Sequence, residues 1–546
     1  MKSAAIVKLG HRSKNQILFN ALPEQTIDID RRIWKVQEWI EAQPVDVDSG
    51  RLREHLLREI YPWSSDYRDN GFKRALERRD PLQVRSVNIE KGVRVEPFPK
   101  WYECRGCHAI GWDEARICSG CNRKRWGQLH FVGYHECGIL LPPFVAKCPK
   151  HEQLKIIRTA STKVSQIEWG CPKCSWRNPQ KGLGIRKCPC GGGHISYNVH
   201  RASSVYVAQV TTLINPPSAD DLDEIRRLGG ATRALHWALG GMIGHTINGG
   251  PQTRADIEAL LANLPEITRI AMLNAVPDSE ISELPALDGI PERLLRAAEQ
   301  EAMELALAVR GGRETREVHH GGLLGIDLVD QFPILRAVFG YTRGETAAST
   351  LQHFRSNNGI LIHADAGMTE ALLVRLDPIR VIDWLRADFP DLPEVHTEKD
   401  ARELLIRKSE IPGRHETVQT PTVGSRVATL IHSYAHRIIR RIAVFAGIDR
   451  EALSEFLLPS HCAFFVYAQP RGEFVLGGLQ ALFEDELDRM LADFVEAEYR
   501  CPLDPGCEQG GSACPACLHL GEPTCRWFNR HLSRAVLFSE HGYLTA

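Results

Sequence analysis

The most regular pattern of apolar and polar positions lies in residues 423–445. Apolar side chains recur there every three or four residues and form a single stripe, made of Val427, Leu430, Ile431, Tyr434, Ile438 and Ile442. This period matches one face of an α-helix, so the sequence predicts a helix with one buried side. His432 and His436 stand four residues apart and therefore share a face of that helix.

Other stretches have the pattern of strands. Residues 204–214 alternate, are rich in β-branched side chains and end at a pair of prolines, which predicts a strand stopped by the prolines. Residues 462–469 and 473–483 predict two more strands joined by a Pro-Arg-Gly turn, with the Gly477–Gly478 pair opening a helix. The C-terminal part of the chain is therefore expected to be an α+β module.

The middle of the chain changes to a helical period. Residues 222–228, 253–264 and 291–309 repeat apolar positions at helical spacing and are separated by glycine and proline. We expect residues 218–420 to form a mostly helical middle domain.

Composition adds limits rather than a function. The chain has 546 residues, is 43% hydrophobic and 25% charged, and carries a formal net charge of −1, so it is not polybasic or polyacidic as a whole. Its N-terminus lacks an apolar leader, and no stretch approaches the roughly 18 apolar residues of a membrane span. We therefore expect a cytoplasmic protein. Because cytoplasmic thiols stay reduced, its sixteen cysteines are better explained by metal than by disulfide bonds.

The first cysteine cluster has the spacing of a zinc ribbon. Two Cys-x-x-Cys pairs, separated by ten residues, are formed by Cys104, Cys107, Cys118 and Cys121. Each pair lies on a tight turn that contains a glycine, and two such turns supply four thiolates to one tetrahedral zinc ion.

The second cluster is less regular. It consists of Cys171, Cys174, Cys188 and Cys190, whose later pair is Cys-x-Cys. Four further residues lie between the two clusters without a standard spacing: His135, Cys137, Cys148 and His151. These four either form another site, complete a ribbon, or are unliganded thiols and surface histidines.

The third cluster has five cysteines for four positions. Cys507, Cys514, Cys517 and Cys525 form the more compact set and are the preferred zinc ligands, with Cys501 as the alternative to Cys507. A site with four thiolates has no position for water, so it is expected to be structural. The pair His432 and His436 either chelates a metal or makes hydrogen bonds between packed helices.

Several enzyme signatures are absent. The sequence has no Gly-x-x-x-x-Gly-Lys-Ser/Thr phosphate loop, and none of its His-Glu pairs continues to the second histidine of a zincin. His396 and Glu398 match half of a zinc-deaminase signature, but the required Pro-Cys-x-x-Cys does not follow at a workable distance. No catalytic residue is therefore predicted.

The cysteine-rich stretch 501–538 resembles the zinc-binding module at the C-terminus of MrfA-type DNA helicases. It is most similar to the version in the DrmB family of DISARM antiphage defence systems. Four other stretches resemble the same family in the same order: RASSVYVAQVTTLINPP at 201–217, FGYTRGE at 339–345, the helix at 430–441 and LGGLQ at 476–480. Ile139 and Ser533 depart from the family, which usually has histidine and aspartate there, and this leaves open any role carried over near Cys137.

The resemblance implies a non-catalytic accessory subunit that works beside a separately encoded DrmA-like ATP-dependent helicase and engages foreign DNA with it. The cysteine clusters predict two to three structural zinc ions, and the resemblance assigns no catalytic residues. Two other functions stay open: a stand-alone zinc-ribbon DNA-binding protein, or a zinc hydrolase or nuclease using His135, His151 or the His432 and His436 pair.

The predicted fold is an α+β multidomain chain with a C-terminal module closed by a four-cysteine zinc site. Its expected divisions are an N-terminal region at 1–95, a zinc-ribbon region at 96–217, the helical middle domain at 218–420 and the C-terminal MrfA-type module at 421–546.

Overall fold

The structure is a computed structural model of the chain. It describes residues 5–9, 12–60, 71–112, 117–157, 163–215, 222–223, 225–226, 229–240, 262, 265–266, 287–309, 312–318, 320–344, 350–357, 359–414, 416–469, 476–496, 500–521, 524–525 and 527–545.

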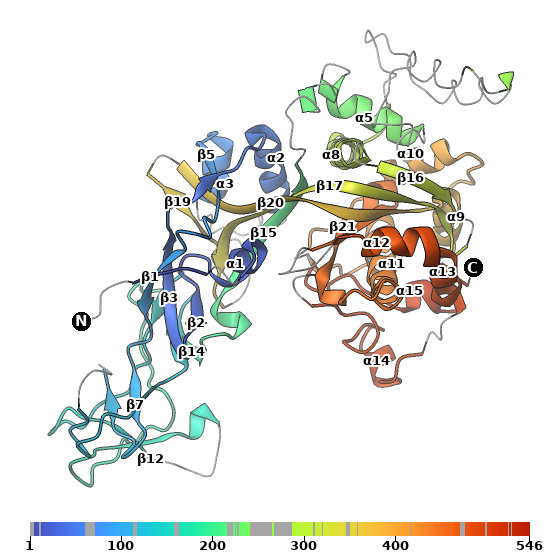
Figure 1. The fold of residues 1–546 in the computed structure, drawn as a ribbon. Helices are drawn as coiled ribbons and strands as arrows, with labels where there is room; N and C mark the ends of the chain where they lie inside the picture. The colour runs from blue at the N-terminus through green and yellow to red at the C-terminus, as the bar shows by residue number, and fades with distance from the viewer. Residues whose placement is uncertain are drawn as a thin grey trace. The chain divides into compact units, whose positions relative to one another are not determined.

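The chain divides into two compact units. Unit 1 comprises residues 1–211 and 336–365, and unit 2 comprises residues 212–335 and 366–546. The long strands β17 (Leu323–Thr342) and β20 (Gly359–Leu376), labelled in Figure 1, each contribute one part to each unit. Three strands therefore straddle the division, since β15 (Val207–Ile214) also crosses it.

Unit 1 begins with an antiparallel sheet of strand order β1-β6-β3-β2. Its strands are β1 (Ala5–Val7), β2 (Thr26–Ile29), β3 (Arg32–Trp39) and β6 (Val93–Pro97). Helix α1 (Lys14–Asn20) starts with a capping box between Ser13 and Gln16. It buries Ile17 and Leu18 in a core shared with Val36 and Val95 of the sheet.

Further elements of unit 1 are short. They are β4 (Gln43–Pro44), α2 (Ser49–Ile60), α3 (Phe72–Glu77), β5 (Leu82–Ser86), β18 (Gln352–His353) and β19 (Arg355–Ser356). Strand β5 pairs in parallel with residues 360–363 of β20, which ties the N-terminal segment to the returning chain.

The cysteine-rich part of unit 1 is built from small sheets. Their strands are β7 (Tyr102–Cys104), β8 (Ile110–Gly111), β9 (Trp126–Gln128), β10 (Phe131–Tyr134), β11 (Leu140–Leu141), β12 (Lys155–Ile157), β13 (Glu168–Gly170) and β14 (Ser196–Val199). They form three sheets, of strand orders β8-β7-β9, β11-β10-β14 and β12-β13. Such small sheets bury little apolar surface, so other bonds must contribute to their stability.

Unit 2 has a sheet covered on both faces. Antiparallel pairing joins β20 to β22 (Ala463–Ala468) and β22 to β21 (Leu453–Leu458). Side chains alternate along β22: Phe464 and Val466 enter one hydrophobic core, whereas Phe465 and Tyr467 enter the core on the other face. The near-continuous apolar sequence of this strand therefore reflects burial on both sides.

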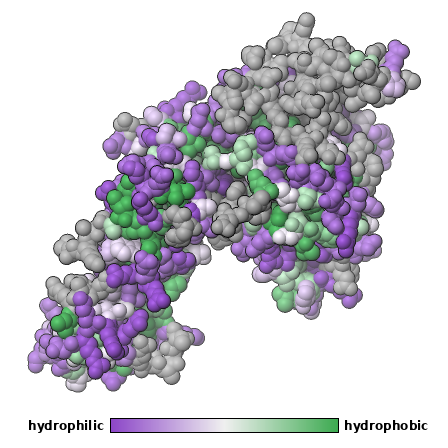
Figure 2. Space-filling model, viewed as in Figure 1, coloured by the Kyte–Doolittle hydropathy of each residue, from purple (hydrophilic) through white to green (hydrophobic). Residues whose placement is uncertain are grey.

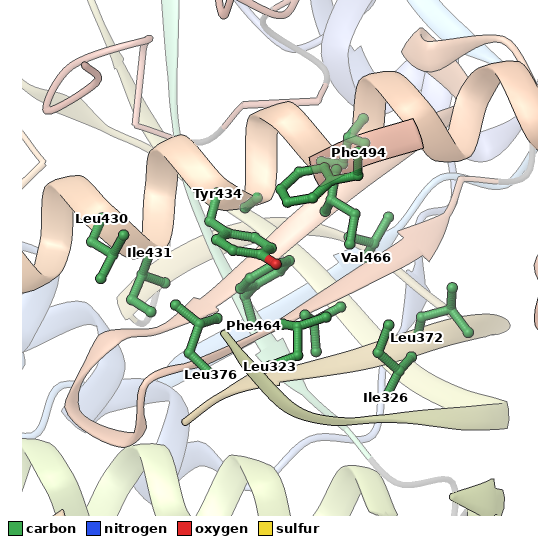
Figure 3. Packing of buried hydrophobic residues seen from close by; sticks show 14 of the residues in the cluster. Leu323, Ile326, Leu372, Leu376, Leu430, Ile431, Tyr434, Phe464, Val466 and Phe494 are labelled. Atoms are coloured by element: carbon green, nitrogen blue, oxygen red, sulfur yellow. The ribbon is translucent and has the colours of Figure 1, made fainter. Parts of the chain in front are cut away.

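Helices cover the two faces. Helix α11 (Val423–Phe445) and helix α13 (Leu487–Glu496) lie on one face, where Tyr434 contacts Phe464 and Phe494 (Figure 3). Helices α5 (Gly230–Leu239) and α8 (Glu292–Ala308) contribute to the opposite core. Other elements of unit 2 include β16 (Gly312–Glu317), α9 (Pro378–Arg386), α10 (Glu398–Lys408), α12 (Gly478–Ala481), α14 (Gly506–Gln509) and α15 (Ala535–Phe538).

The α+β character that the sequence predicted is confirmed, and so are several elements. The predicted helix at 423–445 is α11, the strand at 204–214 is β15, the strand at 462–469 is β22, and the segment at 291–309 is α8. Gly478 opens α12 as expected. The predicted helix at 253–264 lies outside the described residues except for Ala262, and so does the start of the predicted strand at 473–483. The end of that predicted strand, from Gly478 onward, is helical instead, because Gly478 already begins α12.

The middle region differs from its mostly helical expectation. Residues 312–376 contain β16, β17 and β20, and the last two are the longest described strands. Where β17 and β20 are buried on both faces, their sequences are apolar almost without alternation. The spacing of apolar residues alone therefore does not distinguish these strands from a buried helix. Contacts group the residues into two interleaved units. This grouping does not test the expected four-part division, which stays a prediction.

No helix among the described residues is long and apolar enough to cross a membrane. The face shown in Figure 2 carries hydrophilic residues over much of its described surface.

Candidate metal centres

Five groups of four side chains converge in the described part of the chain, with the ligand atoms of each group within 4.8 Å of one another. A tetrahedral zinc ion with Zn–S bonds of about 2.3 Å places neighbouring sulfurs about 3.8 Å apart. The observed Sγ–Sγ distances include 3.5 Å for Cys104–Cys121 and 3.7 Å for Cys507–Cys517. These groups can therefore hold metal ions, and their donor geometry fits a tetrahedral one.

The first group is the set that the sequence placed together: Cys104, Cys107, Cys118 and Cys121. Its turns need glycine, because a Cβ on Gly106 would lie 3.3 Å from Cys121 Sγ and one on Gly120 would lie 3.1 Å from Cys107 Sγ. The Sγ atoms of the two turns meet: Cys104 lies 3.5 Å from Cys121, and Cys107 lies 3.5 Å from Cys118.

Within this group the turn at Cys104 favours the thiolate of that residue, whereas burial raises the pKa of Cys107 and Cys118. Burial raises the pKa of Cys104, but hydrogen bonds from the backbone N–H groups of Gly106 and Cys107 help to outweigh it and bring this pKa to about 7. A metal binds the thiolate, so a lowered thiol pKa prepares the ligand.

The second expected cluster is divided between two groups. Cys171 and Cys174 join Cys148 and His151, whereas Cys188 and Cys190 join His135 and Cys137. In the first of these groups, Cys148 Sγ lies 3.7 Å from Cys174 Sγ and Cys171 Sγ lies 3.5 Å from His151 Nδ1. In the other, Cys137 Sγ lies 3.6 Å from Cys188 Sγ and Cys190 Sγ lies 3.5 Å from His135 Nδ1.

Strand pairing is the physical reason for this division. Strands β12 and β13 pair antiparallel, so the turn at 148–151 before β12 meets the turn at 171–174 after β13. Strands β10 and β14 also pair antiparallel, so the turn at 135–137 after β10 meets the loop at 188–190 before β14. Cys188 and Cys190 therefore do not share a group with Cys171 and Cys174.

The spacings of the paired turns carry a signal that sequence reasoning missed. Cys148 and His151 are separated by two residues, as are Cys171 and Cys174. His135 and Cys137 are separated by one residue, as are Cys188 and Cys190. Pairing turns of equal spacing would have given both groups.

The fourth group contains Cys501, Cys507, Cys514 and Cys517. Cys501 Sγ lies 3.5 Å from Cys514 Sγ, and Cys507 and Cys514 lie 3.7 Å from Cys517. The alternative ligand Cys501 is therefore in this group together with Cys507, and Cys525 is not. Two turns, at 501–503 and 514–517, present three of the thiols, and helix α14 presents Cys507. The backbone N–H of Leu503 donates to Cys501 Sγ at 3.4 Å.

The fifth group places Cys525 with His432, His436 and Glu455. The histidines come from α11, Glu455 comes from β21, and Cys525 comes from the C-terminal segment. Cys525 Sγ lies 3.4 Å from His432 Nε2, while the Glu455 carboxylate lies 3.2 Å from His432 Nε2 and 3.3 Å from His436 Nε2. Sequence reasoning missed Glu455, because nothing in its local pattern marks it as a ligand.

This group is buried, with both histidines fully covered and Glu455 and Cys525 each 2% exposed. Both Glu455 oxygens and His436 Nε2 lack a hydrogen bond of normal geometry among the described residues. Burying such polar atoms without partners costs about 1–3 kcal/mol each. The Glu455 oxygens and the Nε2 atoms of the two histidines face one another at 3.2 and 3.3 Å, and a cation bound among them would satisfy these atoms.

Electrostatics within the group favour its ligand forms. Burial lowers the pKa of His432, which favours the neutral imidazole that metals bind. Burial raises the pKa of Glu455, but the imidazoles of His436 and His432 outweigh it and hold that pKa below its ordinary range. His436 Nδ1 lies 2.9 Å from Leu518 O, and a proton donated there leaves Nε2 free to bind a metal. This bond joins α11 to a turn, so it is not the hydrogen bond between packed helices considered from the sequence.

Comparison with known proteins finds two partial similarities. Residues 13–211 match a family model described as a domain of unknown function, DUF8724. This match includes the three metal-type groups of unit 1 and ends at the residue where the first segment of that unit ends. Over 124 residues the chain is 27% identical to the DISARM protein DrmB of Bacillus paralicheniformis, which covers 20% of this chain and 22% of that relative. The chain is thus similar to DrmB over about a fifth of its length.

Proposed function

We propose that this protein is a non-catalytic accessory subunit of a DISARM-type antiphage complex. In this role it binds a DrmA-like helicase in the cytoplasm and assists that helicase in engaging foreign DNA. The observation that carries the proposal is the 27% identity to DISARM protein DrmB over 124 residues. The resemblance of the C-terminal cysteine motif to the DrmB family supports the same assignment.

The metal-type groups support a structural role. Thiolate and imidazole ligands favour zinc over magnesium or calcium, which prefer oxygen. Each group already supplies four ligand side chains, which is the full set of a structural zinc site. The fifth group, which has a carboxylate and two histidines, is also the most buried, so it offers no approach to a substrate. We therefore propose five structural zinc ions rather than two or three.

The test is co-expression with a DrmA-like helicase. The two chains should elute together in size-exclusion chromatography, and the DNA-dependent ATPase of the helicase should rise in the complex. The matched control is the same helicase with an unrelated zinc-ribbon protein. Separate elution with an unchanged ATPase would reject the accessory-subunit proposal.

Metal analysis separates this proposal from a zinc hydrolase. A hydrolytic site has a water-bound position, so a competitive zinc ligand such as a small hydroxamate should bind it and inhibit. Five tightly held ions, no hydroxamate binding and no hydrolysis of DNA are the expected results. Metal-dependent DNA cleavage that is lost in a His432→Ala variant would favour the hydrolase instead.

A further inference from the structure

A basic pocket lies beside the fourth metal-type group, within unit 2. Its volume is about 580 Å³, and the C-terminal half of α11, the segment 500–518 and the region of α15 form its wall. Six arginines line it: Arg437, Arg440, Arg441, Arg450, Arg500 and Arg534. This concentration is notable in a chain whose formal net charge is −1. We call it the arginine pocket.

Two of these arginines are neutralised by carboxylates. Arg441 Nε lies 3.2 Å from Asp493, and Arg534 Nη2 lies 2.8 Å from Asp504. Arg440 donates instead to two neutral carbonyls, Ala516 O at 2.8 Å and His519 O at 3.1 Å. Arg437, Arg440, Arg450 and Arg500 have no salt-bridge partner among the residues that the structure describes.

A metal ion in the fourth group does not cancel the remaining charge. Zn²⁺ with four thiolates carries two net negative charges, and Cys517 of that group lines the pocket. Four unpaired arginines against two negative charges leave two positive charges in excess. The arginines therefore do more than compensate the thiolates.

Arg437 has hydrogen-bond donors that no described residue accepts from. Its guanidinium lies over the Phe538 ring, 5.4 Å from the centroid, and its Nε and Nη2 are buried without a hydrogen-bond partner. A partly buried cation with unused donors gains most from an anion that accepts both.

We propose that the arginine pocket binds phosphate groups. Guanidinium forks recognise phosphate oxygens through paired hydrogen bonds, and several forks around one concavity match a phosphate with more than one free oxygen. Phosphates reach such a pocket from two sources, the backbone of a nucleic-acid strand or a free polyphosphate. The strand is favoured, because the other walls include Ala443, Val444 and Pro502, which offer no side-chain hydrogen bonds to the base of a free nucleotide.

This inference deepens the proposed function, since it places a DNA-contacting surface on the chain itself. It rests on that function only for the choice of the strand as source. Phosphate binding is measured on the isolated full chain, whereas the accessory-subunit proposal is tested by co-elution with the helicase. The two can therefore fail separately.

The experiment compares two double variants of the full, metal-loaded chain. Arg450→Gln with Arg500→Gln removes two exposed pocket arginines. Arg226→Gln with Arg296→Gln removes two exposed arginines of the same unit that are paired with carboxylates outside the pocket. Fluorescence anisotropy with a labelled single-stranded oligonucleotide, and calorimetry with inorganic triphosphate, measure binding at several salt concentrations.

The pocket variant should bind the oligonucleotide about tenfold more weakly, and the slope of log affinity against log salt should fall by about one to two. The control variant should bind like the wild type. Loss of triphosphate binding with unchanged oligonucleotide binding would support the pocket but assign it to a free polyphosphate. Equal binding of both probes by both variants, or no binding of either probe by the wild type, would overturn the proposal.

Folding is checked by melting temperature and metal content. Both substituted arginines are exposed, so the melting temperature and the metal content of the pocket variant should change no more than those of the control variant. If the double variant melts lower, the conservative Arg437→Lys variant replaces it. Lysine keeps the charge but loses the fork, so weaker binding at unchanged metal content is again expected.

Discussion

At the scale of single residues, Arg343 connects three distant segments of unit 1. Its fully buried guanidinium donates to Gly138 O at 2.9 Å, Val205 O at 2.6 Å and Glu24 O at 2.9 Å. It also lies near the rings of Tyr206 and Tyr341, 5.6 and 4.9 Å from their centroids, and these two rings stack on each other. The FGYTRGE motif that the sequence analysis singled out is therefore explained by a structural arginine.

Replacing Arg343 by methionine should lower the free energy of unfolding of unit 1 by about 3 kcal/mol or more. Each hydrogen bond to a charged donor contributes about 1.5–3 kcal/mol, and two buried carbonyls and one partly buried carbonyl would lose this donor. Urea denaturation followed by tryptophan fluorescence measures the change. Arg343→Lys is the matched variant, and it should recover only part of the loss, because one ammonium does not reach three carbonyls. Wild-type stability in either variant would contradict the role of the fork.

His363 is a second buried polar residue of unit 1. Its ring meets Trp39 and Phe354 edge-on, at centroid distances of 4.5 and 4.6 Å. Its Nδ1 is buried without a hydrogen bond, and burial lowers the pKa of His363 to about 3.

The lowered pKa of His363 should make the free energy of unfolding depend on pH. The unfolded imidazole takes up a proton near pH 6.5, whereas the folded one stays neutral to about pH 3. The stabilisation is therefore complete above about pH 6.5 and is lost as the pH falls. Between about pH 7.5 and about pH 5.5 the loss is about 1.4 kcal/mol. His363→Leu should remove it, so denaturation at both pH values should show a smaller decrease than in the wild type. An equal decrease in both proteins would reject this assignment.

At the scale of elements, helix α11 connects the core of unit 2 to two functional features. One face packs into the apolar core, another presents His432 and His436 to Glu455, and its C-terminal half lines the arginine pocket. Its position is fixed at the start by Thr422, which forms a capping box with Ser425 through hydrogen bonds of 3.2 and 2.8 Å.

Thr422→Ala should therefore destabilise unit 2 by about 1 kcal/mol, the usual contribution of such a cap. Thr422→Ser keeps the oxygen and is the control, with an expected change close to zero. Chemical denaturation followed by circular dichroism at a helix wavelength reports both. If alanine and serine gave the same stability, the cap would contribute nothing here.

At the scale of the whole molecule, the grouping of ligands can be tested by counting metal ions. Cys514 and Cys517 share one group, whereas Cys514 and Cys525 belong to different groups. The double variant Cys514→Ser with Cys517→Ser should lose one ion of five. Cys514→Ser with Cys525→Ser should lose two. Mass-spectrometric metal analysis of the folded fraction measures both, and a loss of one ion in each variant would restore the grouping expected from the sequence.

The sequence by itself determined the local elements and the identity of most ligand residues. Helix α11 follows from its own stripe of apolar residues, and the Cys-x-x-Cys turns follow from local spacing, because both depend on residues close in the chain. The ligands of the first group lie within 18 residues of each other, so spacing alone placed them together.

Only the tertiary structure decided which turns come together in one group that could hold a metal ion. Antiparallel pairing of β10 with β14 and of β12 with β13 divided the second cluster, and the packing of α11 against β21 brought Glu455 to two histidines. The arginine pocket likewise joins α11 to residues more than fifty positions away. These contacts depend on strand register and on which faces are buried together, and neither property is encoded in the spacing of a single motif.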